Sequence, residues 1–306
     1  MITIDELLKL KKMQTINRSL EKAISKSTCL KHKVAAVIET KDKRYVLGWN
    51  GPPEFIKHDR CLREDYSSGK GMELCIGSHA ERRAISHASK NGVYSNEGTI
   101  YLSSWFPCAD CAKSIVDAGI KRLVTHDEVY ADVKNRIFVD VLKKQPYNFE
   151  MAEELIVKAE IEIIVDKSIM YVNRLEKILQ KSWIKETSSD PEKWNKDNPS
   201  FGQCAVTALI VNDYFGGKLV WAPVNVNGRE VSHYFNKIDD KEVGLTKEID
   251  LTKSQFPEGT IIPEGIDKTK GFPSTRNYVL SYPKTLKRYE LLKEKIGNIA
   301  YGNEKG

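Results

Sequence analysis

The stretch from residue 98 to residue 126 constrains the fold more than any other part of the chain. The run GTIYLSS at 98–104 predicts a strand, ADCAKSIVDAG predicts a helix that ends at Gly119, and KRLVTH at 121–126 predicts a second strand. Strands that alternate with helices are typical of a sheet that is covered by helices. The sequence therefore predicts an α/β domain.

The flanking segments extend the same pattern. Apolar residues at helical spacing predict an N-terminal helix over 4–27, and the short TKDK between two strand-like runs predicts a hairpin. The further expected elements are strands at 34–39, 44–50 and 161–165 and helices at 78–91, about 130–144 and 149–159. With helices on both faces, these elements predict a three-layer α/β/α domain with a mixed sheet.

A change of composition near residue 168 predicts a second domain. The segment KETSSDPEKWNKDNPSFGQC is rich in Ser, Pro, Asn and Asp, which favour turns and loops. After it we expect a helix in AVTALIVNDYF, two strands near 218–226 and 230–237, and a tail rich in Pro, Gly and Lys. The predicted domains are residues 1–168 and a smaller α+β domain over residues 169–306.

The composition restricts the class of protein only loosely. The 306 residues carry a formal net charge of +6, which suits anionic partners without identifying one. No run approaches the roughly 18 apolar residues of a membrane helix, and the first residues lack the apolar core of a signal peptide. We therefore expect a cytoplasmic protein whose six cysteines are ligands, nucleophiles or buried thiols rather than disulfides.

Two short motifs stand at the predicted starts of two helices. His79 and Glu81 lie two residues apart in SHAE, and Cys108 and Cys111 form a Cys-x-x-Cys pair in PCADC. Taken alone, SHAE is explained by a capping box between Ser78 and Glu81, and the cysteines by a redox pair or two buried thiols. Taken together, one histidine and two cysteines are the ligand set of a catalytic zinc site with a fourth position open for water.

The combined pattern H-x-E…P-C-x-x-C is the signature of the zinc deaminases. It assigns the metal to His79, Cys108 and Cys111 and leaves Glu81 beside the water. Zinc lowers the pKa of a bound water toward about 7. Glu81 is then expected to take a proton from that water, to pass it to the ring nitrogen of the substrate and to assist the departure of ammonia.

Residues 24 to about 166 resemble the cytidine and deoxycytidylate deaminase family. The resemblance is carried, in order, by STCLKHKVAAVI, LGWNGPP, CLRE, ELCIGSHAERRAI and IYLSSWFPCADCAKSIVDAGIKRLV. The long segment from CLRE to SHAE is more similar to deoxycytidylate deaminases than to enzymes for free nucleosides. The resemblance implies a cytidine deaminase-like fold, a catalytic Zn²⁺ ion, a small-molecule nucleotide substrate and a homo-oligomer. Trp105-Phe106 and a long stretch at 126–149 depart from the family pattern, which leaves the substrate open.

The same resemblance implies two further groups of residues. Substrate contacts are expected at Asn50, which matches a residue that touches the substrate's sugar, and also at Ala80, Ser104 and Trp105. Asn50 is alternatively a plain turn residue. A second, structural zinc is expected to bind Cys29, His58, Cys61 and Cys75. The alternative for these cysteines is a set of small buried thiols.

In the second domain a cysteine, a histidine and an aspartate follow one another along the chain. Cys204 opens an apolar helix directly after Gln203, His233 lies on a predicted strand, and Asp250 follows on the next segment. This order is that of papain-like and transglutaminase-like thiol enzymes. A buried cysteine and an ordinary strand histidine are the alternative. Residues 183–256 resemble the YunG-like family, which implies that these four residues belong to one site without saying what it does.

Three functional hypotheses follow. The first is a zinc-dependent deaminase of a cytosine nucleotide, with conversion of dCMP to dUMP as the expected reaction, fused to a domain with a thiol-dependent activity. The second is deamination of another aminated or modified base or of cytosine in nucleic acid, although the sequence shows no stripe of Lys and Arg interleaved with aromatic residues. The third is a nucleotide sensor without turnover, which the proton-shuttling Glu81 disfavours.

Overall fold

The chain forms two compact units. The structure is a computed structural model that describes residues 3–57, 59–66, 70–103, 106–126, 148–166 and 168–300. The N-terminal unit comprises Ile16–Ile169, and the C-terminal unit comprises Met170–Gly306 together with Met1–Thr15. In the structure the first 15 residues therefore belong to the C-terminal unit, whereas the sequence analysis placed them in the domain of residues 1–168. The reason is that Nε2 of Gln14 donates to the carbonyl oxygens of Asp213 (3.1 Å) and Asn212 (3.4 Å) within the C-terminal unit.

The N-terminal unit contains a five-stranded mixed sheet, as the sequence predicts. Its strands lie in the order β2-β1-β3-β4-β5. Strand β1 pairs antiparallel with β2 and with β3, whereas β3, β4 and β5 are parallel. The bounds of the strands are Ala35–Glu39 (β1), Tyr45–Trp49 (β2), Thr99–Leu102 (β3), Arg122–Thr125 (β4) and Glu162–Val165 (β5).

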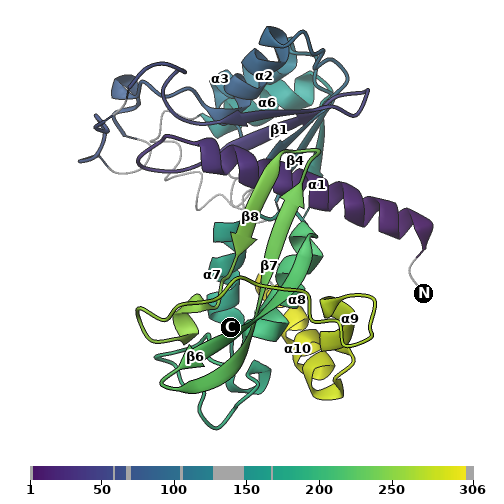
Figure 1. Cartoon of the computed structure of the whole chain (residues 1–306). Helices are drawn as coiled ribbons and strands as arrows, with labels where there is room; N and C mark the ends of the chain where they lie inside the picture. Colours follow the sequence, from purple (N-terminus) through teal and green to yellow (C-terminus); the bar gives the residue numbers. More distant parts are fainter. Residues whose placement is uncertain are drawn as a thin grey trace. The chain divides into compact units, whose positions relative to one another are not determined.

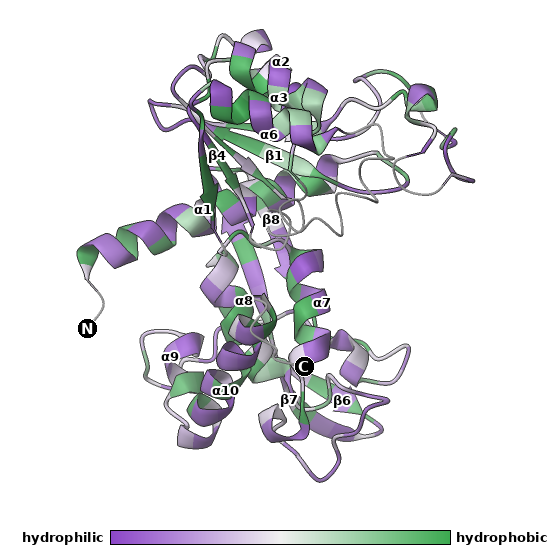
Figure 2. Cartoon of the chain, turned by 180° about the vertical axis from the view of Figure 1, so that it is seen from behind, coloured by the Kyte–Doolittle hydropathy of each residue, from purple (hydrophilic) through white to green (hydrophobic). Residues whose placement is uncertain are grey.

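Helices cover both faces of this sheet (Figure 1). One face carries α2 (Ala80–Lys90), α3 (Ala109–Asp117) and α6 (Phe149–Lys158), and the opposite face carries the part of α1 (Ile4–Lys26) that belongs to this unit. Side chains alternate between the two faces of a strand, so Ile38 and Val37 of β1 point to opposite layers, and both are fully buried. The strands are accordingly hydrophobic (Figure 2). The helix predicted at about 130–144 lies outside the described residues.

The C-terminal unit is an α+β arrangement around a three-stranded antiparallel sheet in the order β6-β7-β8. Helix α8 packs along β7, where Nδ2 of Asn236 donates to the carbonyl oxygen of Ala208 (3.0 Å). Leu179, Leu209 and Leu292 join α7, α8 and α10 in one core. The bounds are Val172–Ser182 (α7), Cys204–Phe215 (α8), Lys218–Val226 (β6), Arg229–Asp240 (β7), Leu245–Ile249 (β8), Thr275–Leu280 (α9) and Pro283–Ala300 (α10).

Several elements of this unit are absent from the sequence-based expectation. Helix α7, strand β8 and the helices α9 and α10 lie in segments that the sequence analysis left without assignment or described as a tail. The predicted likeness to papain or transglutaminase remains a prediction. In the part of the chain that the structure describes, no helix combines the length and the apolar character that crossing a bilayer requires. The cytoplasmic location remains a prediction as well.

Candidate metal centre and active site

The residues of the two sequence motifs stand at two helix starts. His79 is the residue that precedes the first turn of α2, and Cys108 precedes the first turn of α3, both with extended backbone. Ser78, which the alternative explanation of the motif places at the cap of α2, is not the capping residue. It instead exchanges two backbone hydrogen bonds with Gly51 (2.8 and 3.2 Å), which hold the motif against the end of β2.

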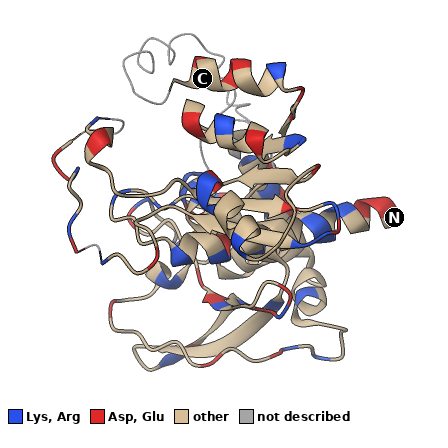
Figure 3. Cartoon of the chain, turned by 90° about the horizontal axis from the view of Figure 1, so that it is seen from above, with Lys and Arg blue, Asp and Glu red and all other residues tan. Residues whose placement is uncertain are grey.

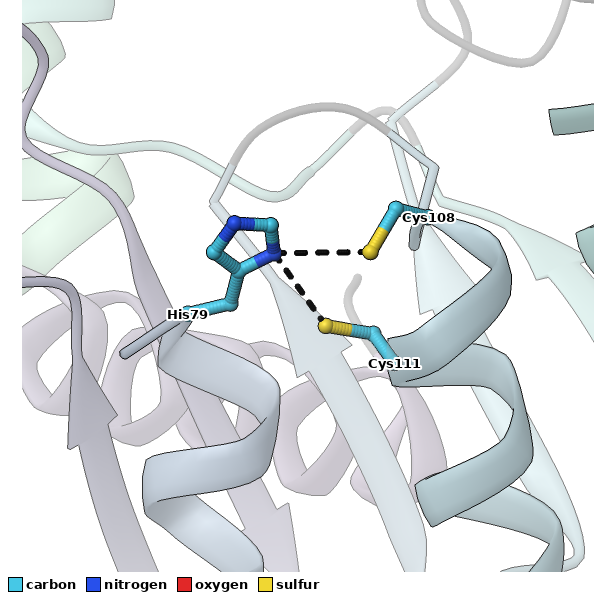
Figure 4. A group of neighbouring side chains, drawn as sticks. All are labelled: His79, Cys108 and Cys111. Carbon is cyan, nitrogen blue, oxygen red and sulfur yellow. Dashed lines mark hydrogen bonds between the residues drawn. The ribbon is translucent and has the colours of Figure 1, made fainter. Parts of the chain in front are cut away.

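The two motifs converge on one point (Figure 4). Nδ1 of His79 lies 3.4 Å from Sγ of Cys108 and 3.4 Å from Sγ of Cys111. The three possible ligand atoms lie within 4.8 Å of one another. Two soft thiolates and an imidazole nitrogen are a donor set that zinc prefers, and three protein ligands leave one tetrahedral position for another group. The residues therefore fit a zinc ion of the catalytic type.

Glu81 lies next to this group on the first turn of α2. Its side chain is buried and hydrogen-bonds with the Cys111 thiol. Burial raises the pKa of Glu81 above its usual value. The Cys111 thiol donates to Cys108, and this bond together with the neighbouring His79 ring lowers the pKa of Cys108 to about 4. The same bond and burial raise the pKa of Cys111. The site thus favours one thiolate even before a metal is considered.

Close backbone packing positions α2 for this role. A Cβ atom on Gly48 of β2 would lie 2.2 Å from the carbonyl oxygen of Ala80 and 2.4 Å from the amide nitrogen of Ala84, so only glycine allows this approach. Nη2 of Arg83, on the next turn, donates to the carbonyl oxygens of Gly51 (2.7 Å) and of the following proline. Sequence analysis missed both residues because neither carries a spacing signal.

Comparisons with known proteins agree with this geometry. Residues 10–127 match the cytidine and deoxycytidylate deaminase zinc-binding region, and residues 171–300 match the YunG protein family. ComE operon protein 2 of Bacillus subtilis is 32% identical over 157 residues, which are 50% of this chain and 71% of that protein. The chain belongs to the cytidine and deoxycytidylate deaminase family, with a YunG region at its C-terminal end.

Other relatives match over shorter segments. Deoxycytidylate deaminase of Saccharomyces cerevisiae is 30% identical over 105 residues, which are 33% of this chain and 33% of that enzyme. The uncharacterized protein YunG of Bacillus subtilis is 39% identical over 71 residues, 23% of this chain and 56% of that protein. The chain therefore covers less than two thirds of these two relatives. The dCMP deaminase of cyanophage S-TIM5, solved with dCMP and dUMP, covers 54% of this chain and 99% of its own, with 20% identity and a TM-score of 0.36.

The predicted substrate contacts of the deaminase region have different surroundings. The side-chain oxygen of Asn50 accepts from the Ser27 hydroxyl (2.8 Å) and the Val34 amide (2.8 Å), and its nitrogen donates to the His32 carbonyl oxygen (2.6 Å). These bonds tie the segment before β1 to the end of β2. Ala80 is buried in the core. Ser104 and Trp105 lie outside the described residues.

The predicted second zinc site is not assembled among the described residues. Cys29 and Cys61 are half-buried and Cys75 is exposed, and all three are free thiols. They do not form a metal-sized group with other described His, Cys, Asp or Glu residues. The fourth expected ligand, His58, lies outside the described residues. The second zinc remains a prediction.

The four predicted residues of the YunG region occupy neighbouring elements. Gln203 and Cys204 begin α8, His233 lies on β7, and Asp250 directly follows β8. Nε2 of His233 lies 2.7 Å from Oδ2 of Asp250. The structure adds Gln255, whose side-chain nitrogen lies 3.2 Å from Nδ1 of His233. Nothing in the sequence distinguishes Gln255 from an ordinary polar loop residue.

Proposed function

We propose that the N-terminal unit is a zinc-dependent hydrolytic deaminase of a cytosine nucleotide, which converts dCMP and water to dUMP and ammonia. The observation that carries the proposal is the convergence of His79, Cys108 and Cys111 beside the buried carboxyl group of Glu81. Membership of the deaminase family supports the reaction class. The relatives in Saccharomyces cerevisiae and Schizosaccharomyces pombe named deoxycytidylate deaminase support the choice of substrate.

Each residue has a distinct part in this reaction. His79, Cys108 and Cys111 would hold the zinc ion, which supplies a water whose pKa is lowered toward about 7. Glu81 takes a proton from the attacking water and gives it to the ring nitrogen N3 of the base. It then carries a proton to the departing amine, so that ammonia leaves and the carbonyl of uracil forms. Because Glu81 begins and ends the cycle in the same protonation state, the reaction balances with one water consumed.

The charge distribution bears on the alternative substrates. Figure 3 shows that basic and acidic residues are interspersed along the described helices and loops. A protein that binds single-stranded nucleic acid is expected to combine a basic groove with stacked aromatic residues. A free nucleotide is therefore the first substrate to test, with other aminated bases and single-stranded DNA behind it. We also propose that the protein forms a homo-oligomer, as the resemblance to the deaminase family implies.

The test compares ammonia release by the zinc-loaded wild type, Glu81→Gln and Glu154→Gln. The panel contains dCMP, CMP, dCTP, deoxycytidine, adenosine and single-stranded DNA. Glu154 is an exposed acidic residue of α6 in the same unit and forms a surface ion pair with Lys158, so it controls for the loss of a carboxylate. Loss of a proton shuttle lowers the rate by about 10²- to 10⁴-fold.

Three results are informative. Release of ammonia from dCMP that falls by this factor in Glu81→Gln alone supports the proposal. Release from another compound with the same dependence keeps the deaminase and replaces its substrate. Tight nucleotide binding without ammonia release, unchanged in Glu81→Gln, identifies a sensor and overturns the proposed activity.

A further inference from the structure

The YunG region contains a second group of residues with catalytic chemistry. Cys204 is the first residue of α8, and its thiol lies 3.9 Å from the carbonyl oxygen of Ser232, the residue before His233 on β7. The thiol is close enough to the imidazole of His233 to raise the pKa of that histidine. At the start of a helix the backbone amides have no partners within the helix.

The imidazole of His233 is held from its other side. Its side chain is fully buried, and Nε2 lies 2.7 Å from Oδ2 of Asp250, which is 14% exposed. The ring of Phe256 meets the imidazole edge-on at 4.9 Å, and Phe235 stacks at 5.6 Å. With Nε2–H donated to the carboxylate, Nδ1 is the acceptor nitrogen; it accepts from Nε2 of Gln255 (3.2 Å), a donor that the thiol has to replace in order to exchange a proton with Nδ1.

Further hydrogen bonds hold the carboxylate of Asp250 in place. Its second carboxylate oxygen, Oδ1, accepts from the amide and the hydroxyl of Thr252 (3.1 and 3.2 Å). Nε2 of Gln255 lies 3.2 Å from Nδ1 of His233. The carboxylate is therefore oriented before any substrate binds, as a positioning group for a catalytic histidine requires.

The groups that face His233 favour its protonated form. Burial opposes the imidazolium, but the hydrogen bonds from His233 to Asp250 and Cys204 outweigh it and raise the pKa of His233 to about 9. Arg288 of α10 is close enough for its charge to interact with Cys204, although burial lowers the pKa of Arg288. Asp250, Cys204 and Arg288 are thus the charged groups that act on this pair.

Gln203 is also placed as a binding residue would be. It is fully buried, and its side-chain nitrogen donates to the carbonyl oxygen of Ile184 (3.0 Å). This bond orients the amide and leaves Oε1 as a buried acceptor without a hydrogen-bond partner among the described residues. A buried acceptor without a donor is unfavourable, and a bound N–H group would supply the missing hydrogen bond.

We propose that the YunG region is a second, independent active site that cleaves an acyl compound, in which Cys204 is the nucleophile, His233 its base and Asp250 the positioning residue. A buried small cysteine beside an unrelated histidine would not need a carboxylate on the far side of the imidazole. The shared chemistry of the substrates is an unhindered carbonyl bonded to nitrogen or sulfur. This inference does not depend on the deaminase activity of the other unit.

The reaction consumes one water. The thiol proton moves to Nδ1 of His233, and the sulfur attacks the carbonyl carbon, so that a C–S bond forms. The imidazolium then protonates the leaving amine or thiol, whose bond to carbon breaks and leaves an S-acyl cysteine. His233 next takes a proton from water, which attacks the thioester and releases a carboxylic acid while the thiol of Cys204 is restored.

The first test measures thiol reactivity in the full-length, zinc-loaded protein. Iodoacetamide is applied between pH 5 and pH 9, and labelling of Cys204 is followed by peptide mass spectrometry, with free glutathione as the ordinary thiol in the same sample. We expect Cys204 to react at least tenfold faster than glutathione at pH 6. His233→Asn is expected to remove the difference, and Asp250→Asn to reduce it and to shift the pH profile, which a merely structural residue would not do.

The second test looks for the acyl intermediate. The protein is incubated with a short acyl thioester or a short acyl p-nitroanilide, and intact and peptide masses are recorded before and after hydroxylamine. An adduct on Cys204 that hydroxylamine removes, and that is absent in Cys204→Ser, supports the proposal. The probe that forms it distinguishes thioesters from amides. Ammonia release from dCMP, measured in the same samples, should be unchanged by Cys204→Ser.

Two results overturn the proposal. One is labelling of Cys204 in the wild type no faster than of glutathione at every pH, which requires no variant to fold. The other is fast labelling without an acyl adduct from either probe, which rejects the acyl substrate. Should His233→Asn fail to fold, as circular dichroism would show, the wild-type profile and Asp250→Asn decide.

Discussion

Both units place a cysteine thiol at the start of a helix beside a histidine, but the two histidines differ in their other neighbours. Nδ1 of His79 lies 3.4 Å from two sulfurs, those of Cys108 and Cys111. His233 hydrogen-bonds with one thiol and lies 2.7 Å from a carboxylate oxygen of Asp250. Two thiols that converge on one nitrogen suit a metal ion, whereas one thiol with an imidazole oriented by a carboxylate suits a nucleophile.

The partner of the histidine, rather than the helix start, separates the two kinds of chemistry. Both cysteines stand at a helix start, so this position is common to the two sites. The two sites also differ in the group that their carboxyl side chain contacts. Glu81 hydrogen-bonds with a thiol of the cluster, where it can exchange protons with a substrate, while Asp250 bonds to the histidine itself.

Replacing one cysteine of each site by serine gives the largest expected effect, which is on zinc content and ammonia release. Cys111→Ser removes a thiolate ligand, so we expect zinc to fall from about one ion per chain to near zero and ammonia release to be lost with it. Cys204→Ser should leave the zinc content and the ammonia release unchanged. Elemental analysis after gel filtration with a chelator, together with the ammonia assay, measures both. Zinc retained in Cys111→Ser would contradict the role of Cys111 as a zinc ligand. Zinc lost in Cys204→Ser would contradict the separation of the two sites.

The pH dependence of the unfolding free energy tests the ionisation of His233 in the second site. The pKa of His233 is about 9 in the folded protein, above an unfolded value of about 6.5, so protonation favours the folded state. Its contribution of about 3 kcal/mol is full below about pH 6.5 and is lost as the pH rises through about 9. His233→Gln should therefore destabilise the C-terminal unit more at pH 6 than at pH 10.

Urea unfolding of wild type and His233→Gln at the two pH values measures this effect. The free energy difference between the two proteins should shrink by about 3 kcal/mol between pH 6 and pH 10. The unfolding of the N-terminal unit, followed through its zinc release, is the internal control. A difference that does not change with pH would show that the ionisation of His233 is not linked to folding.

A pair of glycine variants tests the packing of each site's unit. Gly48→Ala would bring a Cβ to 2.2 Å from a backbone oxygen, while Gly265→Ala would meet the side-chain atoms Cγ2 of Val220 (2.4 Å) and Cζ of Phe235 (2.6 Å). A backbone atom yields less than a side chain. We expect a loss of about 2–3 kcal/mol for Gly48→Ala and of about 1 kcal/mol for Gly265→Ala by calorimetry. The reverse order would contradict this reading of the two contacts.

The smallest expected effect concerns the start of α1. Gln14→Ala removes hydrogen bonds to the carbonyl oxygens of Asn212 and Asp213, so it should destabilise the C-terminal unit by about 1 kcal/mol. The N-terminal unit should unfold as in the wild type. Glu154→Gln on the surface of α6 is the matched control, with an expected change near zero. An effect of Gln14→Ala on the N-terminal unit alone would reject the division of α1.

Much of the fold of the N-terminal unit follows from local patterns. The hairpin at TKDK, the helix that ends before Gly119 and the mixed sheet are recognisable because period-two and period-3.6 patterns repeat over short windows. In the C-terminal unit the same patterns identify α8, β6 and β7 but miss β8 and α10. Strand β8 is short and polar, so packing against β7 rather than a local pattern makes it regular. In α10 the residues Tyr289, Leu292 and Ile296 recur at helical spacing, so that helix carried a local signal that the sequence analysis overlooked.

The sequence by itself predicted the metal ligand set, because the combined pattern H-x-E…P-C-x-x-C favours His79, Cys108 and Cys111 as ligands over a capping box and a redox pair. It also named Cys204, His233 and Asp250 as a group, although it left their chemistry open. Only the tertiary structure decided that the amide of Asn50 is engaged by the segment before β1, that Gln255 reaches His233, and that Gly48 must lack a side chain. Such contacts depend on how closely distant backbone segments approach, which no local spacing encodes.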